Sequence, residues 1–418
     1  MKKHYRTLLP TYLKGLSTGK YTLKQAAEST GYSETWLCLL KKQYLETGFD
    51  CLEHRNKYRK PAIAKPKELR ERIAGIYADK YKDVNFQFYR RCLEEFEGIK
   101  ISYSTLRSIM SEYGQISPEA HKIKRKKKSK RPRIRRANFG DMIQIDGTPY
   151  QWFYKFGNTK RYCMVGAIDD ATSKITGLYI TEFECLYGYC EMLRQTIERH
   201  GVPREIYSDR AAIFCVTPKK KQNLTQWEQL EGLHDKKTQW QRILDDLKIH
   251  QILAWSPEAK GRVERMWRTI QGEIPQLFFL NKIETVEQAN AWLSNVYIDK
   301  FNALHSVEPA KKEQFFLQTD KNLDDILCAQ ISRKTDKDGC ISFHGYKFHV
   351  EDCWRVSYRP CMVCISERGI YAKFENDPCY YPLKCLDEFQ RDLADHMPQV
   401  VENIIYRYMY AYAKEISA

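Results

Sequence analysis

Three carboxylates stand at points where a folded sheet would present side chains for chemistry. Asp146 follows the apolar run "GDMIQI", Asp209 follows "REIYS", and Glu264 comes shortly after the turn "SPEAKG". Carboxylates a few ångströms apart raise one another's pKa, so a group of three needs cations beside it. Hard oxygen ligands suit Mg²⁺ or Mn²⁺, and two such ions can activate an attacking oxygen and stabilise a leaving oxygen at phosphorus. The residue types therefore indicate metal-dependent phosphoryl transfer.

The elements around these acids predict a mixed α/β sheet that could bring them together. Three strands come in succession, followed by alternating helices and strands. We expect Asp146 to end the first strand, Asp209 to end the fourth, and Glu264 to open a helix after the fifth. Sites in open α/β sheets form near strand ends and the adjoining helix starts. Asp169 and Asp170 are expected in the hairpin turn between the second and third strands.

Cations surround Glu264 at the start of its helix. Lys260, Arg262 and Arg265 lie within four residues of it. The free N–H groups of a helix start already favour anions, so these cations predict a surface that binds phosphate. Arg262 and Arg265 are three residues apart and should share a face, with Glu264 pointing elsewhere. We expect at least one of the two arginines to contact DNA; the alternative is an ion pair with Glu264 or another acid.

The charge balance favours a polyanionic partner. The chain has 69 Lys plus Arg against 53 Asp plus Glu, a net charge of +16. The segment "HKIKRKKKSKRPRIRR" cannot build a core, and it is either a solvated linker or a linker that lies along DNA phosphates. We expect phosphate contacts from its cations: Lys126, Lys127, Lys128, Arg131, Arg133, Arg135 and Arg136.

Two helical units precede this basic segment. In residues 20–48, Thr22 can cap a first helix, Gly31 breaks it, and Ser33 can cap a second helix. Helix, glycine turn and helix form the helix-turn-helix pattern, although a small helical bundle could look similar. The following stretch, 61–116, reads as three more helices and a second such unit. We expect the two units to bind DNA.

In the C-terminal third, the sequence pattern changes from mixed helices and strands to short strands. Short alternating strands with glycine turns predict a small β-barrel, and a tyrosine-rich helical tail follows. Cys361 and Cys364 have metal-like spacing, but without a second ligand pair we expect packed thiols. The other cysteines are scattered, which is typical of reduced thiols. Without a long apolar segment or a signal-peptide core, we expect a cytoplasmic, nucleoid-associated protein.

Three motifs in order, "QIDGT", "YSDRAAIF" and "SPEAKGRVER", resemble those of DDE transposases and retroviral integrases. The layout looks most like bacterial insertion-sequence transposases of the ISNCY group, and the likeness covers most of the chain. The resemblance implies an RNase H-like core with Asp146, Asp209 and Glu264 as the metal-binding triad, served by two Mg²⁺ or Mn²⁺ ions. The separation of Asp209 and Glu264 is longer than in retroviral integrases, and segment 217–238 could supply the surplus. Glu258 is the fallback third ligand.

The expected fold class is multidomain α/β: an RNase H-like catalytic core, N-terminal helix-turn-helix units and a C-terminal small β-barrel. The expected divisions are two helix-turn-helix domains (1–58 and 61–116), a basic linker (117–136), the core (137–305), a second linker (306–335), the β-barrel (336–388) and a helical tail (389–418).

The resemblance implies a transposase that binds the terminal inverted repeats of an insertion sequence. It would cut the DNA ends and join the 3′ hydroxyl to another DNA strand. Its partners would be double-stranded DNA, both transposon ends and target, and further copies of the chain, because two ends must be joined in a dimer or higher oligomer. Two alternatives stay open: a catalytically silent DNA-binding regulator and a metal-dependent nuclease without strand transfer.

Overall fold

Capping residues define the helices of the N-terminal part as the sequence predicts. The computed structural model describes residues 6–53, 65–118, 135–216, 237–254, 261–351, 356–386 and 397–410. Thr22 and Gln25 form a capping box at the start of α2, and Gly31 ends that helix with a φ of 79°. The Ser33 hydroxyl accepts a hydrogen bond from the backbone N–H of Trp36 at the start of α3.

The chain divides into two compact units, Met1–Ala78 and Asp79–Ala418. The helices of the first unit are η1 (Arg6–Leu8), α1 (Leu9–Ser17), α2 (Leu23–Thr30), α3 (Glu34–Thr47), η2 (Gly48–Leu52) and most of α4 (Lys67–Lys80). Leu13, Leu37 and Leu40 lie at the centre of its core. Trp36 on α3 is 39% exposed and stacks on Tyr32.

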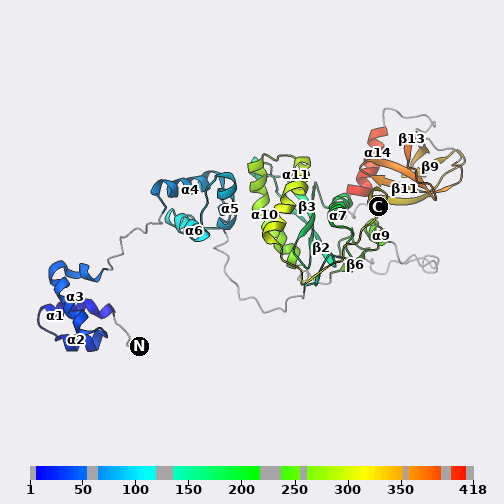
Figure 1. Ribbon diagram of the computed structural model, residues 1–418. Helices are drawn as coiled ribbons and strands as arrows, with labels where there is room; N and C mark the ends of the chain where they lie inside the picture. The colour runs from blue at the N-terminus through cyan, green and yellow to red at the C-terminus, as the bar shows by residue number, and fades with distance from the viewer. Residues whose placement is uncertain are drawn as a thin grey trace, which may run out of the picture. The chain divides into compact units, whose positions relative to one another are not determined.

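A five-stranded mixed sheet forms the centre of the second unit (Figure 1), in the order β4-β3-β2-β5-β6. The strands are β2 (Met142–Tyr150), β3 (Tyr162–Asp169), β4 (Ile175–Thr181), β5 (Glu205–Ser208) and β6 (His250–Leu253). The first three pair antiparallel, and β5 and β6 continue the sheet in parallel. The mixed α/β prediction is therefore confirmed; Asp170 lies in the expected turn between β3 and β4, whereas Asp169 is the last residue of β3.

Helices cover both faces of this sheet, and they are α7 (Leu186–His200), α9 (Gln239–Asp246), α10 (Gly261–Asn281), α11 (Val286–Trp292), the π-helix η6 (Leu293–Tyr297) and α12 (Ile298–His305). Two glycines mark where helices approach closely. A Cβ on Gly177 would lie 2.3 Å from the carbonyl of Met192 on α7, and one on Gly166 would lie 2.8 Å from the Trp267 ring on α10.

The outer edge of β4 is closed by two asparagines. Asn290 on α11 accepts from the backbone N–H of Ile180 and donates to its carbonyl, at 2.7 and 2.9 Å. Asn302 on α12 makes the same pair of bonds with Ile175. These side chains satisfy backbone groups that would otherwise form an open sheet edge.

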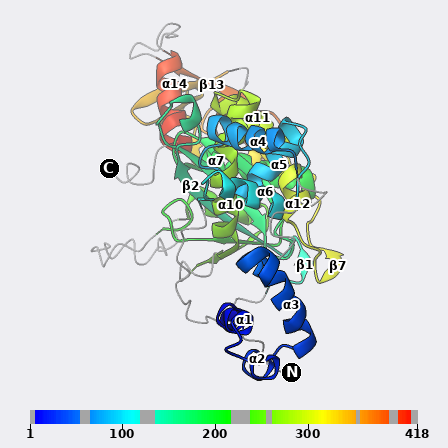
Figure 2. The same ribbon diagram turned by 90° about the vertical axis from the view of Figure 1, so that its left-hand side faces the viewer.

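A second sheet of six antiparallel strands follows, in the order β8-β11-β12-β13-β10-β9. Its strands are β8 (Ala329–Lys334), β9 (Cys340–Phe343), β10 (Tyr346–Val350), β11 (Pro360–Ser366), β12 (Gly369–Phe374) and β13 (Tyr381–Leu386). The described residues include no pairing between the end strands β8 and β9, so the sheet is nearly closed rather than a complete barrel. Figure 2 shows α14 (Met397–Ile405) beside it, and the π-helix η7 (Tyr406–Tyr410) follows.

The segment expected to be a linker between core and barrel, 306–335, contributes strands to two sheets, the six-stranded sheet and a separate two-stranded sheet. β8 pairs with β11, so the second sheet begins before residue 336. β7 (Lys311–Gln314) pairs with β1 (Asn138–Phe139) at the entrance to the core. The remaining short elements are η3 (Tyr154–Phe156), α13 (Leu323–Ile326), α5 (Phe86–Phe96) and α6 (Tyr103–Glu112). Among the helices described, none combines the length and apolar character needed to span a bilayer.

Candidate active site

Strand register places Asp209 next to Asp146. The parallel pairing of β2 and β5 runs from Met142 opposite Glu205 to Gln144 opposite Tyr207. Asp146 and Asp209 each lie two residues beyond that last pair. Adjacent strands are about 4.8 Å apart, so the two acids start from neighbouring backbone positions.

Asp146 lies within its strand rather than at its end. Antiparallel pairing with β3 continues from Ile143 opposite Asp169 to Tyr150 opposite Tyr162. The pairing of β2 with β5 ends at Gln144, whereas β2 extends four residues past Asp146 in its pairing with β3. Asp209 directly follows the end of β5, as expected, and its Oδ1 accepts a 2.9 Å hydrogen bond from the backbone N–H of Ala211.

Helix α10 is bound to β2 by side-chain hydrogen bonds at three successive levels. The Val263 N–H donates to Gln144 Oε1 at 3.4 Å, and the Trp267 indole N–H donates to Asp146 Oδ2 at 3.2 Å. Gln271 Nε2 then donates to Thr148 Oγ1 at 3.0 Å.

The spacing of these bonds follows from geometry. Four helical residues rise about 6 Å and two strand residues about 6.6 Å, so one helix turn matches one dipeptide of the strand. Residues 263, 267 and 271 therefore contact residues 144, 146 and 148 in turn. This register fixes the lengthwise position of α10 relative to Asp146.

Glu264 occupies the first turn of α10, as the sequence predicts, and its side chain is exposed. It lies three residues before Trp267, which places it near the side of the helix that faces β2. Within the described part of the chain, no three or more His, Cys, Asp or Glu side chains are close enough together to hold a metal ion. The structure thus brings Asp146 and Asp209 to neighbouring positions without assembling a three-carboxylate cluster.

The donor chemistry of these acids fits a hard divalent cation. All three candidate ligands offer carboxylate oxygens, which Mg²⁺ and Mn²⁺ favour. Asp146 has one oxygen engaged by the Trp267 indole, which holds the carboxylate in a fixed orientation. Glu258, the fallback ligand, lies outside the described residues.

On the far face of β2, Gly147 allows another carboxylate to approach. A Cβ on Gly147 would lie 2.9 Å from Glu184 Oε1, so a larger residue here would displace that carboxylate. The Tyr189 hydroxyl donates to Glu184 Oε1 at 2.5 Å. Burial, and then the charge of Glu184, raise the pKa of Tyr189 well above its usual value, so the phenol stays protonated as a donor.

The two arginines near Glu264 have different environments. Arg265 is exposed, and its Nε donates to the carbonyl of Gly261 at 3.0 Å. Arg262 is only 9% exposed and forms a 2.9 Å ion pair with Asp170. Its place in the core differs from the surface position expected for a phosphate contact, because residues 262, 266 and 270 share the buried face of α10.

The end of the basic segment also binds the core. Arg135 Nη1 donates to the carbonyl of Ala171 at 2.9 Å, and Arg136 forms ion pairs with Glu205 and Asp141. The remaining cations expected to bind DNA lie outside the described residues: Lys126, Lys127, Lys128, Arg131, Arg133 and Lys260. So does most of segment 217–238.

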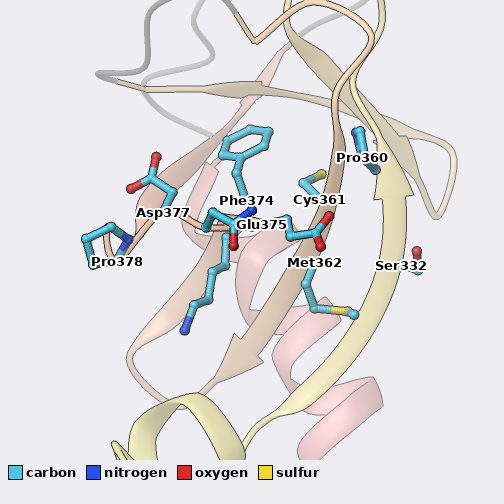
Figure 3. A pocket seen from close by; sticks show the side chains of 10 residues that line it. Ser332, Pro360, Cys361, Met362, Phe374, Glu375, Asp377 and Pro378 are labelled. Carbon is cyan, nitrogen blue, oxygen red and sulfur yellow. The ribbon is translucent and has the colours of Figure 1, made fainter.

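Two other features lie away from these acids. Cys361 and Cys364 are buried in β11 as free thiols, as expected for packed cysteines. A groove in the second sheet is lined by Met362, Phe374 and Asp377 (Figure 3), and none of its lining residues belongs to the predicted triad.

Sequence reasoning missed three side chains that organise this region: Gln144, Asp170 and Trp267. Gln144 lies two residues before Asp146, and Trp267 lies one helix turn after Glu264. Each spacing puts a polar side chain on the same face of its element as a candidate ligand. That pattern could have been recognised in the sequence. The role of Asp170 depends on contacts between distant segments and had no local signal.

Two curated proteins match the chain in sequence. The transposase for insertion sequence IS1202 of Streptococcus pneumoniae is 29% identical over 321 residues, covering 69% of this chain and 66% of that protein. The putative transposase y4bF of Sinorhizobium fredii (strain NBRC 101917 / NGR234) is 28% identical over 344 residues, covering 80% of this chain and 70% of that protein. The chain thus matches just under two thirds of the length of the first relative. No known family profile matches it.

Two solved structures show a distant likeness to the chain. The simian T-cell lymphotropic virus intasome in complex with PP2A regulatory subunit B56 gamma covers 74% of this chain and 95% of its own, at 13% identity and a TM-score of 0.32. The HTLV-2 integrase catalytic core domain in complex with magnesium covers 42% of this chain and 93% of its own, at 15% identity and a TM-score of 0.29. The resemblance to insertion-sequence transposases expected from the motifs is confirmed by the two curated relatives, to which this chain is similar over 69% and 80% of its length.

Proposed function

We propose that the chain is a DDE transposase that cuts the ends of an insertion sequence and joins them to another DNA strand. The observation that supports the proposal is the register of β2 and β5, in which Asp146 and Asp209 each come two residues after the last paired residues, while hydrogen bonds at three levels hold α10, the helix of Glu264, against β2. The similarity to two transposases supports the same activity.

In this proposal Asp146, Asp209 and Glu264 hold the metal ions of an RNase H-like core. Two Mg²⁺ or Mn²⁺ ions bound there would supply the Lewis acid chemistry of phosphoryl transfer. The Trp267 indole orients Asp146, and the backbone N–H of Ala211 orients Asp209. Arg265, exposed one residue after Glu264, is positioned to contact a phosphate near the scissile bond.

The N-terminal helices and the basic segment would recognise the DNA. α2 and α3 form the first proposed helix-turn-helix unit, with α3 as the helix that enters a groove. α4, α5 and α6 form the second. The proposed domain limits are those of the sequence analysis, except that the second sheet includes β8. Because two element ends must be joined, the active species is a dimer or higher oligomer on DNA.

The test is a reaction with the full chain, Mg²⁺ or Mn²⁺, and DNA carrying the terminal repeats of the element. Mapping of the cut and joined strands distinguishes three outcomes. Cut ends together with 3′ ends joined to a second DNA support a transposase. Cutting without joining supports a nuclease, and tight binding without cutting supports a silent regulator.

A further inference from the structure

Asp170 is a fully buried carboxylate with three partners from three separate segments. Its Oδ1 accepts from Gln144 Nε2 at 2.8 Å and pairs with Arg262 Nη1 at 2.9 Å. Its Oδ2 accepts from the backbone N–H of Arg136 at 2.8 Å. The residue is 0% exposed, so each of these partners compensates a charge that would otherwise be costly to bury.

The partners have matching positions relative to the proposed triad. Gln144 lies two residues before Asp146 on β2, and Arg262 lies two residues before Glu264 on α10. One carboxylate oxygen therefore joins the strand that carries the first acid to the helix that carries the third. Gln144 adds a second link to α10, because its Oε1 accepts from the Val263 N–H.

The third partner of Asp170, Arg136, belongs to the basic segment that is proposed to bind DNA. Arg136 is the last residue of the basic segment, and its backbone binds Asp170 while its side chain pairs with Glu205 on β5. β5 is the strand that leads directly to Asp209. The end of the basic segment thus contacts elements that position all three acids.

We propose that Asp170 is a positioning residue that sets the first turn of α10, and with it Glu264, relative to Asp146, and links this geometry to the basic segment. The inference rests on the proposed function for its consequence in catalysis, but the positional role is a property of the fold. Asp170 itself contacts neither DNA nor metal in this account.

The neighbouring carboxylate provides a matched control. Asp169 is also 0% exposed, and it accepts from the Gly140 N–H at 3.0 Å and from the Thr172 N–H and hydroxyl, each at 2.7 Å. These contacts hold the turn and the entrance to β2, and none of them reaches α10. Asp169→Asn and Asp170→Asn therefore both remove one buried charge, but only the second removes the charge that faces α10.

The first test is hydrogen exchange measured by mass spectrometry on the full chain without metal or DNA. In Asp170→Asn, amides of residues 261–266 should exchange roughly 10-fold or more faster than in the parent, with α7 unchanged. Asp169→Asn should leave residues 261–266 at the parental rate. Equal exchange of residues 261–266 in the two variants would overturn the positioning role.

The second test is the Mg²⁺ dependence of terminal DNA cutting. Asp170→Asn should lower activity or raise the Mg²⁺ midpoint by roughly 10- to 100-fold, as loss of partners around metal ligands typically does, and Asp169→Asn should shift the midpoint far less.

If Asp170→Asn does not fold, Gln144→Met breaks the same link without leaving an unpaired charge and should move both readouts in the same direction. An inactive parent chain with the expected exchange pattern would reject the proposed function alone. An active parent whose Asp170→Asn and Gln144→Met variants match Asp169→Asn would reject this inference alone.

Discussion

The Trp267 indole N–H donates a 3.2 Å hydrogen bond to Asp146 Oδ2, and this bond joins α10 to a carboxylate of the proposed triad. Trp267 is 5% exposed, so the ring that donates this bond is held by the packing around it. The second oxygen of Asp146 is not involved in this bond. The tryptophan thus fixes the orientation of the carboxylate that the proposal assigns to metal binding.

Trp267→Phe should weaken Mg²⁺ use while preserving the fold. Phenylalanine keeps most of the buried ring but cannot donate, and a hydrogen bond to a charged group contributes about 1.5–3 kcal/mol. We expect the Mg²⁺ midpoint for cutting to rise by roughly 10-fold or more, measured in a metal titration. Gln271→Met is the matched control, because it removes the bond to Thr148 one helix turn further on. An equal effect in both variants would argue against a specific role for the indole.

Removing each acid of the triad separately should abolish cutting without loss of DNA binding. Asp146→Asn, Asp209→Asn and Glu264→Gln keep the shape of the side chain but remove the charge that attracts the cation. Cutting is measured by strand mapping and binding by gel shift with terminal DNA. Glu258→Gln should remain active. Full activity of Glu264→Gln together with loss in Glu258→Gln would reassign the third ligand.

Alanine at the two arginines of α10 should separate stability from DNA contact. Arg262→Ala leaves Asp170 buried without its cation, and breaking a buried pair typically costs about 3–5 kcal/mol. Arg265 is exposed, so Arg265→Ala should leave the melting temperature nearly unchanged and reduce strand joining. Thermal melts and joining assays on both variants check this. A stable Arg262→Ala would contradict the importance of the pair.

Local sequence signals predicted the parts of the fold that local chemistry decides. The caps at Thr22 and Ser33 and the turn at Gly31 follow from backbone preferences of single residues, and all three are as expected. The strand before Asp209 and the helix that carries Glu264 follow from apolar patterns bounded by turn residues. The succession of strands along the chain around these acids was predictable for the same reason.

Long-range pairing decided what the sequence could not show. β2 continues past Asp146 because β3 pairs with it as far as Tyr150, and no feature of residues 146–150 alone indicates that partner. The burial of Arg262 follows from Asp170, which is distant in sequence. Arg262 is spaced with Met266 and Ile270 along the apolar face of the helix, which indicated burial. The charge of the arginine nevertheless favoured the prediction that it is exposed. The domain limits and the triad's role remain predictions.

Glu273 should make stability depend on pH in a direction set by its burial. Burial raises the pKa of this carboxyl above its usual 4.5, and the ion pair with Arg91 opposes that shift only in part. A raised folded-state pKa means that the stabilising contribution is complete below about pH 4.5 and is lost as the pH rises through the folded value. Glu273→Gln lacks this titration. The melting temperature of the parent should therefore fall relative to Glu273→Gln as the pH rises from below 4.5 toward neutrality, and the opposite trend would contradict the raised pKa.

Replacing Lys126, Lys127 and Lys128 together with glutamine should weaken binding to every DNA sequence alike. Each phosphate that the basic segment neutralises releases counterions and steepens the dependence of log K on log salt by roughly 0.9. The triple variant should therefore flatten that slope by as much as about 2.7, with no change in preference for terminal over unrelated DNA.

The measurement is a salt series on the full chain carrying Asp209→Asn, which keeps the DNA uncut. Lys311→Gln with Lys312→Gln, two exposed lysines on β7, is the control and should leave the slope near the parental value. A changed sequence preference with an unchanged slope would mean that the segment reads bases rather than phosphates.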